Sequence, residues 1–367
     1  MTAPNRWPLH PRPLEGEALS SWLARLAGCY SMSVRNLLDS AMDGREASED
    51  DLDLAPPQKL LRILIQRTAV LPDTLSRMSL TGWAPWLMDS LEAEPTAFDT
   101  YVNQFSVLLA PGRRPRRALA GWRAWIPRSP LDRACPHCLA DPSRQGLLLA
   151  WKLPLLLSCP EHGCLLEPCV GIPGDFLILA PKDSPPGNPS VAVRAMDSLT
   201  WQAVTNGCVD LPRRAVHAGT WFRLLRTIID ELSGPLSQWR SRTNDLRRMW
   251  EECNRPVRGG ITRWQPFEDA TWEKQTHLLT GAAQAIAAMK SGNMTGRGAS
   301  AYLFLPEPER PIDDGTPPGS HAKTATTALQ AAVAKLNRIT AAALSNPETS
   351  QALYDLAANG CAGIQPK

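Results

Sequence analysis

The sequence predicts a mainly α-helical protein that contains one small β module, and two patterns support this prediction. Apolar residues recur at helical spacing in most segments, as near the start with Leu19, Trp22, Leu23, Leu26 and Ala27. Between residues 135 and 169 this pattern gives way to five of the nine cysteines, arranged as two close pairs around an apolar run. We therefore expect helical domains on both sides of a cysteine-centred module.

The composition is that of a folded chain with sizeable cores. The 367 residues are 43% hydrophobic and 20% charged, which excludes global disorder. The formal charge of +3 is too small to indicate a nucleic-acid partner unless the basic residues are clustered. No apolar run approaches the roughly 20 residues of a membrane-spanning helix, and the N-terminus lacks the apolar core of a signal peptide. We expect a cytoplasmic protein, in which clustered cysteines favour metal binding over disulfides.

The cysteine-centred module has the ligand spacing of a zinc site. Cys135-x2-Cys138 is followed after twenty residues by Cys159-x2-His162. Each close pair places two ligands on one side of a Zn²⁺ ion, which prefers four N/S ligands in a tetrahedron. This layout is zinc-ribbon-like: Gly163 suits the sharp turn after the second pair, and the apolar run between the pairs is compatible with a short strand. Further ligand types nearby, ranked second, are His137, Cys164 and Cys169.

Three other readings of the module are weaker. Buried apolar cysteines rarely fall into two such pairs, and a disulfide does not suit the compartment. A catalytic metal needs an open coordination position and a base, but H-E-x-x-H is absent and the order of motifs found in zinc deaminases is reversed.

A helix pair between residues 58 and 80 has the order of a helix-turn-helix. The first helix places Leu61, Leu64, Ile65 and Thr68 on one face. After the break at residues 70–72, Asp73 is the expected cap of a short second helix whose Leu75 and Met78 point inward. If this helix reads DNA, its open face carries Thr74, Ser76, Arg77 and Ser79. The alternative is an ordinary pair of packed helices.

An arginine-rich run separates the helix pair from the zinc module. It contains no acidic residue, and tryptophans interleave with its cations: Arg113, Arg114, Arg116, Arg117, Trp122, Arg123, Trp125 and Arg128. Arginine pairs with phosphates and tryptophan stacks or packs, so DNA contact is one reading. A solvated basic linker is the other.

These segments define a predicted domain organisation. Residues 1–110 form an N-terminal helical and helix-turn-helix domain, and residues 111–190 hold the arginine-rich run and the zinc module. Residues 191–305 form a helical domain, including an amphipathic helix over residues 217–233. Residues 306–367 comprise a Pro-rich linker and two C-terminal helices. No phosphate-binding loop and no G-x-S-x-G elbow is present, so we do not expect an enzyme.

The order of motifs resembles that of the TniQ family of bacterial transposition proteins. The resemblance is carried by "PRPLEGEALSSWLARLA", by the arginine run before "CPHCLA", and by "LAWKLPLLLSCPEHGCLLEPC". It implies a non-catalytic accessory factor of transposition that connects target DNA to an AAA+ ATPase of the TniB/TnsC type. A DDE transposase is then recruited indirectly, and some relatives are tethered to CRISPR effectors. By match, the zinc ligands are Cys135, Cys138, Cys159 and His162.

The chain departs from the family pattern at one place, and two other classes of protein compete with the resemblance. Many relatives carry a further C-P-x-C-G, where this chain has only "EPCVGIPG" with Cys169, so a second zinc ion is doubtful. The alternatives are a zinc-containing helix-turn-helix transcription regulator and, less favoured, a zinc-dependent hydrolase or deaminase. Finding a transposase gene and an ATPase gene beside this gene would distinguish the adaptor from the regulator.

The N-terminal arm is the segment we expect to contact the ATPase. Trp7 and the surrounding prolines make the arm extended, semi-rigid and partly apolar, which suits a groove on a partner. In the competing reading, Trp7 only covers the zinc module or the first helix.

Overall fold

The structure is a computed structural model that describes residues 6–42, 52–83, 95–123, 131–173, 176–180, 187–257, 261 and 263–306. The chain divides into two units, Met1–Glu307 and Pro308–Lys367. The predicted Pro-rich linker and C-terminal helices lie outside the described residues, as do Trp125 and Arg128 of the arginine-rich run. Among the described helices, none has the length and apolar character needed to span a bilayer.

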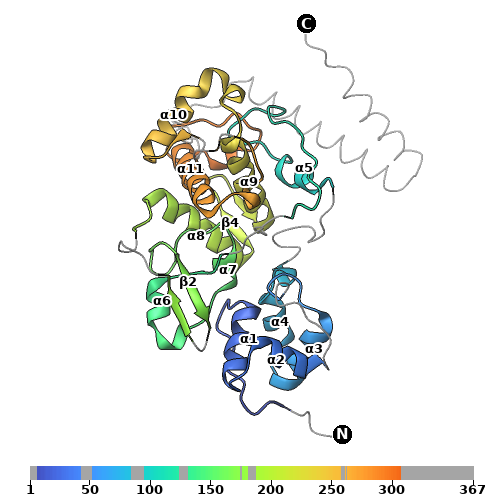
Figure 1. Ribbon diagram of the computed structural model, residues 1–367. Helices are drawn as coiled ribbons and strands as arrows, with labels where there is room; N and C mark the ends of the chain where they lie inside the picture. The colour runs from blue at the N-terminus through green and yellow to red at the C-terminus, as the bar shows by residue number, and fades with distance from the viewer. Residues whose placement is uncertain are drawn as a thin grey trace, which may run out of the picture. The chain divides into compact units, whose positions relative to one another are not determined.

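The N-terminal part is a small group of helices with its own core (Figure 1). The elements are α1 (Leu19–Gly28), α2 (Val34–Met42), α3 (Gln58–Thr68), α4 (Pro72–Arg77) and the 3-10 turn η2 (Leu80–Trp83). All five apolar residues that predicted α1 are buried in the structure. Helical periodicity therefore identified the buried stripe of α1, although Ser21 and Ala24, which lie outside this stripe, are buried as well.

The helix pair α3–α4 has the predicted order, with corrections to its details. Ala69 ends α3 in a left-handed conformation (φ 55°), and α4 begins at Pro72, with Leu71 rather than the expected Asp73 at the N-cap position. Proline at the first helical position fixes the start of the helix, because its φ is already helical and it needs no N–H partner. The buried face of α3 consists of Leu60, Leu64 and Thr68, and the predicted Leu61 and Ile65 are only half-buried.

The cysteine-centred module contains a three-stranded antiparallel sheet in the order β1-β2-β3. Its elements are β1 (Arg133–Ala134), α6 (Pro136–Ala140), η3 (Pro142–Arg144), α7 (Leu149–Lys152), β2 (Glu167–Ile172) and β3 (Phe176–Leu179). The strand expected in the apolar run is wrong for residues 149–152, which form the helical turn α7. This run is apolar apart from Lys152 and Ser158, so its periodicity does not distinguish a strand from a buried helical turn.

The remaining described residues form a helical part built around α9 (Figure 1). Its elements are α5 (Ala97–Val102), α8 (Val191–Asn206), β4 (Cys208–Asp210), β5 (Ala215–His217), α9 (Ala218–Ser233), η4 (Leu236–Gln238), η5 (Arg240–Arg242), α10 (Thr243–Glu252), η7 (Phe267–Asp269), α11 (Trp272–Lys290) and η8 (Ala301–Phe304). The helix predicted over residues 217–233 is confirmed as α9. Both α8 and α11 pack against it, as does α5 from early in the chain.

Candidate metal centre

The first cysteine pair sits on a tight turn that leads into α6. Cys135 is the N-cap residue of this helix, and its sulfur accepts a hydrogen bond from the backbone N–H of Cys138 at 3.5 Å. Pro136 at the first helical position fixes the start of the turn. Two thiols three residues apart are thereby directed to the same side of the helix start.

The second pair sits on a hairpin-like turn. The N–H of Cys159 donates to the carbonyl of Cys164 at 2.8 Å, and the N–H of Gly163 donates back to the carbonyl of Cys159 at 2.8 Å. Gly163 has φ +64°, a left-handed conformation that glycine adopts without strain, as the sequence predicted. This turn directs Cys159 and His162 toward the first pair.

The four predicted ligands converge on one point. The Nδ1 atom of His162 lies 3.4 Å from the sulfurs of Cys135 and Cys138 and 3.6 Å from that of Cys159, and the sulfurs of Cys138 and Cys159 are 4.0 Å apart. All four donor atoms lie within 4.8 Å of one another. A zinc tetrahedron with bonds of about 2.3 Å to sulfur and 2.0–2.1 Å to nitrogen has S···S edges of about 3.8 Å and S···N edges of about 3.6 Å. The cluster therefore fits a four-coordinate metal ion.

The surroundings of the cluster favour a closed metal site. The three cysteines are buried and His162 faces solvent. Burial raises the pKa of the Cys138 thiol to about 11. Contact with Cys135, together with burial, raises the pKa of Cys159. Such thiols stay protonated unless a cation compensates the buried charge, so metal binding must release protons.

The second-ranked ligand types lie close to the cluster but outside the tetrahedron. The sulfur of Cys164 is buried and lies 3.5 Å from that of Cys135, where its S–H can stabilise the Cys135 thiolate. The ring of His137 lies beside that of His162, with centroids 5.2 Å apart. Cys169 is buried in β2, opposite Leu179 of β3.

We call the turn that carries Cys135 and Cys138 the first knuckle and the turn that carries Cys159 and His162 the second knuckle. A carboxylate that the sequence motifs do not reveal holds the second knuckle in place. Asp197 of α8 is buried and accepts hydrogen bonds from the N–H of Leu157 (3.2 Å), and from the N–H (2.7 Å) and hydroxyl (2.5 Å) of Ser158. Ser158 directly precedes the ligand Cys159. Burial raises the pKa of Asp197 to about 7, although the hydrogen bonds from Ser158 and Leu157 act in the opposite direction. No motif marks this residue, because it is 35 positions from its nearest predicted ligand in the chain, His162.

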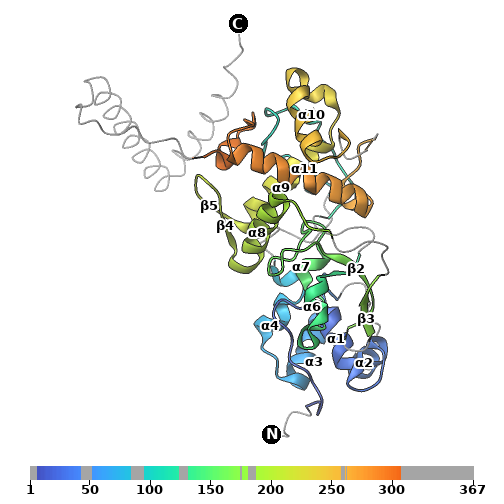
Figure 2. The ribbon, with the colours of Figure 1, turned by 90° about the vertical axis from the view of Figure 1, so that its left-hand side faces the viewer.

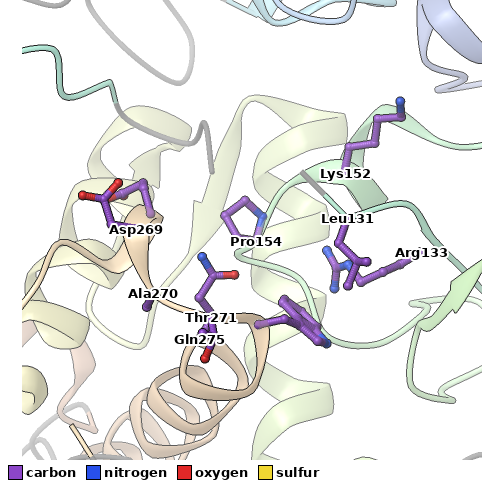
Figure 3. A pocket seen from close by; sticks show the side chains of 10 residues that line it. Leu131, Arg133, Lys152, Pro154, Asp269, Ala270, Thr271 and Gln275 are labelled. Atoms are coloured by element: carbon purple, nitrogen blue, oxygen red, sulfur yellow. The ribbon is translucent and has the colours of Figure 1, made fainter. Parts of the chain in front are cut away.

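Arg133 holds the loop between the two knuckles from the other side. Its guanidinium donates to the backbone carbonyls of Trp151, Leu153 and Leu156 at 2.6–2.7 Å, and it lies over the ring of Trp272 of α11, 4.1 Å from the centroid. A cavity of about 210 Å³ opens here between the metal module and the start of α11, and Figure 3 shows Arg133 and Pro154 on one side of it and Thr271 and Gln275 on the other. Burial lowers the pKa of Arg133 to about 9.

The metal module is joined to α1 through Glu17. The backbone of residues 16–18 pairs with that of residues 147–149, through Ala18 N–H to Leu147 O and Leu149 N–H to Gly16 O, both 2.9 Å. Glu17 is fully buried and accepts hydrogen bonds from the Ser21 hydroxyl (2.9 Å) and from the guanidinium of Arg25 (2.8 Å). Glu17 lies two residues before α1, and Ser21 and Arg25 follow it at intervals of four residues on the helix. This explains the spacing of the "EGEALSSWLARLA" motif.

The arginines of the basic run have two different environments. Arg113 and Arg116 are exposed. Arg114 is half-buried as a residue, but its side chain is only 7% exposed; it donates to the carbonyls of Val102 and Phe105 and pairs with Asp230 and Glu231 of α9.

Arg117, the last of the four arginines predicted to contact DNA, also contacts other residues of the protein. Arg117 lies over the ring of Trp264 at 3.5 Å from the centroid and 3.8 Å from Asp230. The expectation that four arginines share a phosphate-binding role is therefore revised. Arg114 and Arg117 anchor the run to the helical part, because buried carboxylates of α9 need cationic partners.

The predicted face of α4 is only partly open. Thr74 and Arg77 are exposed, Ser76 is half-buried, and Ser79 is buried, contrary to the expectation. Thr74 and Arg77 line a hollow of about 1090 Å³ whose other walls include residues of the metal module and of α8.

Trp7 is attached to the N-terminal helices. It is half-buried against their core, and its N–H donates to the carbonyl of Arg67 at 2.9 Å. The neighbouring arm is fixed by Tyr30, whose hydroxyl bonds the N–H and carbonyl of Leu9, and by the indole N–H of Trp22, which donates to Pro11 O. This arrangement agrees with the reading in which Trp7 covers the first helices. Leu9 stays exposed.

Together these features define a mainly helical protein in which a Cys₃His cluster that can hold a metal ion is built into a helix-supported β module. Residues 8–166 match the family model TniQ, which spans α1–α4 and both knuckles. This match supports a TniQ family protein, and the TniQ family implies an accessory protein associated with transposition. No curated protein and no solved structure matches the chain.

Proposed function

We propose that this chain is a non-catalytic target-selection adaptor of DNA transposition, which binds DNA and an AAA+ ATPase of the TniB/TnsC type. The observation that carries the proposal is the TniQ match over residues 8–166, together with the convergence of four metal-ligand side chains within it. A DDE transposase is then an indirect partner. An adaptor without chemistry of its own acts by binding one assembly of its partner more tightly than another.

The metal of the proposal is zinc, in a structural role. Three thiolates and one imidazole form a donor set typical of structural zinc, and the ligand distances match its tetrahedron. A closed four-ligand site leaves no position for water or substrate. When bound, the ion supplies folding free energy to the module rather than a reaction step.

Direct DNA contact is proposed for the two exposed arginines of the basic run, Arg113 and Arg116, with Thr74 and Arg77 as a second, more local contact. Each phosphate neutralised by an arginine releases counterions and steepens the salt dependence of binding, with a slope of about −0.9 per contact on duplex DNA. Replacing Arg113 and Arg116 with Ala should therefore weaken binding to all sequences and flatten the slope by roughly 2. An unchanged slope would assign the run to a purely structural role.

The control for that experiment is a pair of exposed arginines elsewhere. Arg247 and Arg248 are exposed neighbours on α10, and their replacement with Ala removes the same charge. We expect this pair to leave the salt slope unchanged. Replacing Arg114 instead should unfold the protein before it reports on DNA, because Arg114 pairs with Glu231 inside the core.

The adaptor role is tested by a pulldown of a TniB/TnsC-type ATPase with the purified full chain, on DNA and without it. Co-purification of the ATPase, followed by the transposase, supports the proposal. Binding to DNA alone, with no retention of the ATPase, would favour the transcription regulator. For the arm, Leu9→Ser changes an exposed apolar residue, whereas Trp7→Ala also removes packing against the helices. Thermal melts accompany both variants. If only Trp7→Ala loses ATPase binding, its melting temperature shows whether the loss comes from a missing contact with the ATPase or from lost packing of the N-terminal helices.

A further inference from the structure

A fifth sulfur lies beside the four metal-ligand side chains. Cys164 is buried, and its Sγ atom lies 3.5 Å from that of Cys135. Two sulfurs bound to the same zinc ion are about 3.8 Å apart, so this separation is close to that of two ligands of one ion. Cys164 nevertheless lies outside the group of four donor atoms that are all within 4.8 Å of one another. The centre therefore has one more thiol beside it than a four-coordinate ion uses.

The backbone holds Cys164 at the end of the second knuckle. Its carbonyl accepts the N–H of Cys159 at 2.8 Å, and Ser158 pairs with Leu165 in an isolated antiparallel bridge. From there the chain continues into β2, and α6, which follows the first knuckle, lies beside the β2–β3 hairpin in both views (Figure 1 and Figure 2). Because both ends of the turn are fixed, rotation about the Cα–Cβ bond of Cys164 is the movement that brings its sulfur nearer the ion.

The position of Cys164 in the sequence is also that of a zinc ligand. Four residues separate Cys159 from Cys164, and structural zinc sites commonly use cysteine pairs that are separated by two to four residues. The second knuckle therefore offers two alternative ligand pairs around the same ion. One is Cys159 with His162, and the other is Cys159 with Cys164.

The two candidates for the fourth coordination position differ in exposure. His162 faces solvent, whereas Cys164 is buried, like the three cysteine ligands. Water or a partner protein can compete for an imidazole at the surface, and its departure leaves three thiolates around an ion that prefers four ligands. Thiolate is a preferred ligand of zinc, and the Cys164 sulfur is already beside the Cys135 ligand. Cys164 is therefore placed to fill the position that His162 leaves.

We propose that Cys164 is a reserve ligand, which takes the fourth coordination position when His162 leaves it and converts the site from three thiolates and one imidazole to four thiolates. The exchange transfers no electrons. The Cys164 S–H gives its proton to solvent as the bond between zinc and sulfur forms, and the bond between zinc and the imidazole nitrogen breaks. The inference rests on the zinc ion of the proposed function, but it does not depend on DNA binding or on the ATPase.

The test uses the full chain loaded with Co²⁺ in place of zinc. The visible bands of Co²⁺ report tetrahedral coordination, and its charge-transfer absorption from sulfur grows with the number of thiolate ligands. Titration with Co²⁺ compares the wild type with His162→Ala and with the double variant His162→Ala/Cys164→Ser. The matched control is His162→Ala/Cys169→Ser, because Cys169 is as buried as Cys164 but lies in β2, opposite Leu179.

We expect His162→Ala to keep tetrahedral Co²⁺, with a charge-transfer absorption about one third stronger than that of the wild type, since four thiolates replace three. The double variant without Cys164 should bind Co²⁺ at least about tenfold more weakly than His162→Ala, because it loses a ligand and not only a neighbouring group. The control without Cys169 should bind as His162→Ala does.

Equal affinity of His162→Ala and its Cys164 double variant would overturn the proposal. So would a loss of Co²⁺ confined to His162→Ala/His137→Ala, because His137, whose ring lies beside that of His162, is then the replacement ligand. If the Cys164 double variant fails to fold, the His162→Ala spectrum decides alone: an absorption no stronger than that of the wild type, or loss of the ion, means that Cys164 does not bind. A wild type without a tetrahedral Co²⁺ spectrum would overturn the metal centre as well, whereas a normal wild-type spectrum confines the failure to the reserve ligand.

Discussion

Replacing Asp197 with Ala is the sharpest perturbation of the metal module, because it touches no ligand. In the wild type this carboxylate accepts hydrogen bonds from two backbone N–H groups and one hydroxyl, of Leu157 and Ser158, all in a buried site. Each buried donor left without an acceptor costs about 1–3 kcal/mol. Three such donors amount to about 3–9 kcal/mol, which is a large part of the roughly 5–15 kcal/mol by which domains are stable.

The same change should loosen the metal ion. Ser158 directly precedes the ligand Cys159, and removing the groups that orient a ligand typically lowers metal affinity about 10–100-fold. Asp197→Asn keeps one acceptor oxygen, so we expect an intermediate loss of stability. Asp210→Ala is the matched control, because this carboxylate of β4 is exposed and bonds only Gln202 among the contacts that the structure describes.

The assay is urea unfolding combined with transfer of metal to a chromogenic chelator. We expect Asp197→Ala to lower the free energy of unfolding by at least 3 kcal/mol and to speed metal transfer, and Asp210→Ala to change neither by much. If Asp197→Ala is as stable as the control and holds its metal equally well, Asp197 does not support the second knuckle.

Three further predictions concern other buried groups. Glu17→Gln should lower stability by about 2–4 kcal/mol in urea unfolding, since Arg25 loses its charged partner; an effect below 1 kcal/mol would contradict it. Burial raises the pKa of Glu231 from 4.5 to about 7, so the folded state holds this proton more tightly and stability falls as pH rises through that window, by about 3 kcal/mol. Glu231→Gln should remove that fall; an identical pH profile would refute it. Gly281→Ala should destabilise by about 1–3 kcal/mol despite alanine's better helix propensity, because its Cβ would lie 2.4 Å from the Trp250 ring; Trp250→Leu should relieve the clash in a double-mutant cycle.

The sequence was informative where the determinants are local. The ligand set depends on two x2 spacings and a turn glycine, and all four ligands meet in the structure. The apolar stripe of α9 is likewise local, because its residues recur every three or four positions along one helix. All six predicted residues of this stripe are buried: Trp221, Leu224, Leu225, Ile228, Ile229 and Leu232.

The sequence did not predict contacts between residues that are far apart along the chain. Arg114 belongs to a run that reads as a solvated basic linker or a DNA contact, and only the fold shows that Asp230 and Glu231 lie beside it. Residues of α5 were grouped with the N-terminal helices, but Phe98 and Val102 belong to the core around α9. Hydrophobic periodicity shows that a face is buried, not which element buries it.

The metal centre is tested most directly by measuring the metal content of the full chain purified without chelator, together with its thermal unfolding. We predict about one zinc ion per chain, and for Cys138→Ser a loss of the ion together with a clearly lower melting temperature. A wild-type chain without metal, or a Cys138→Ser variant that melts like the wild type, would contradict a structural zinc ion between the two knuckles.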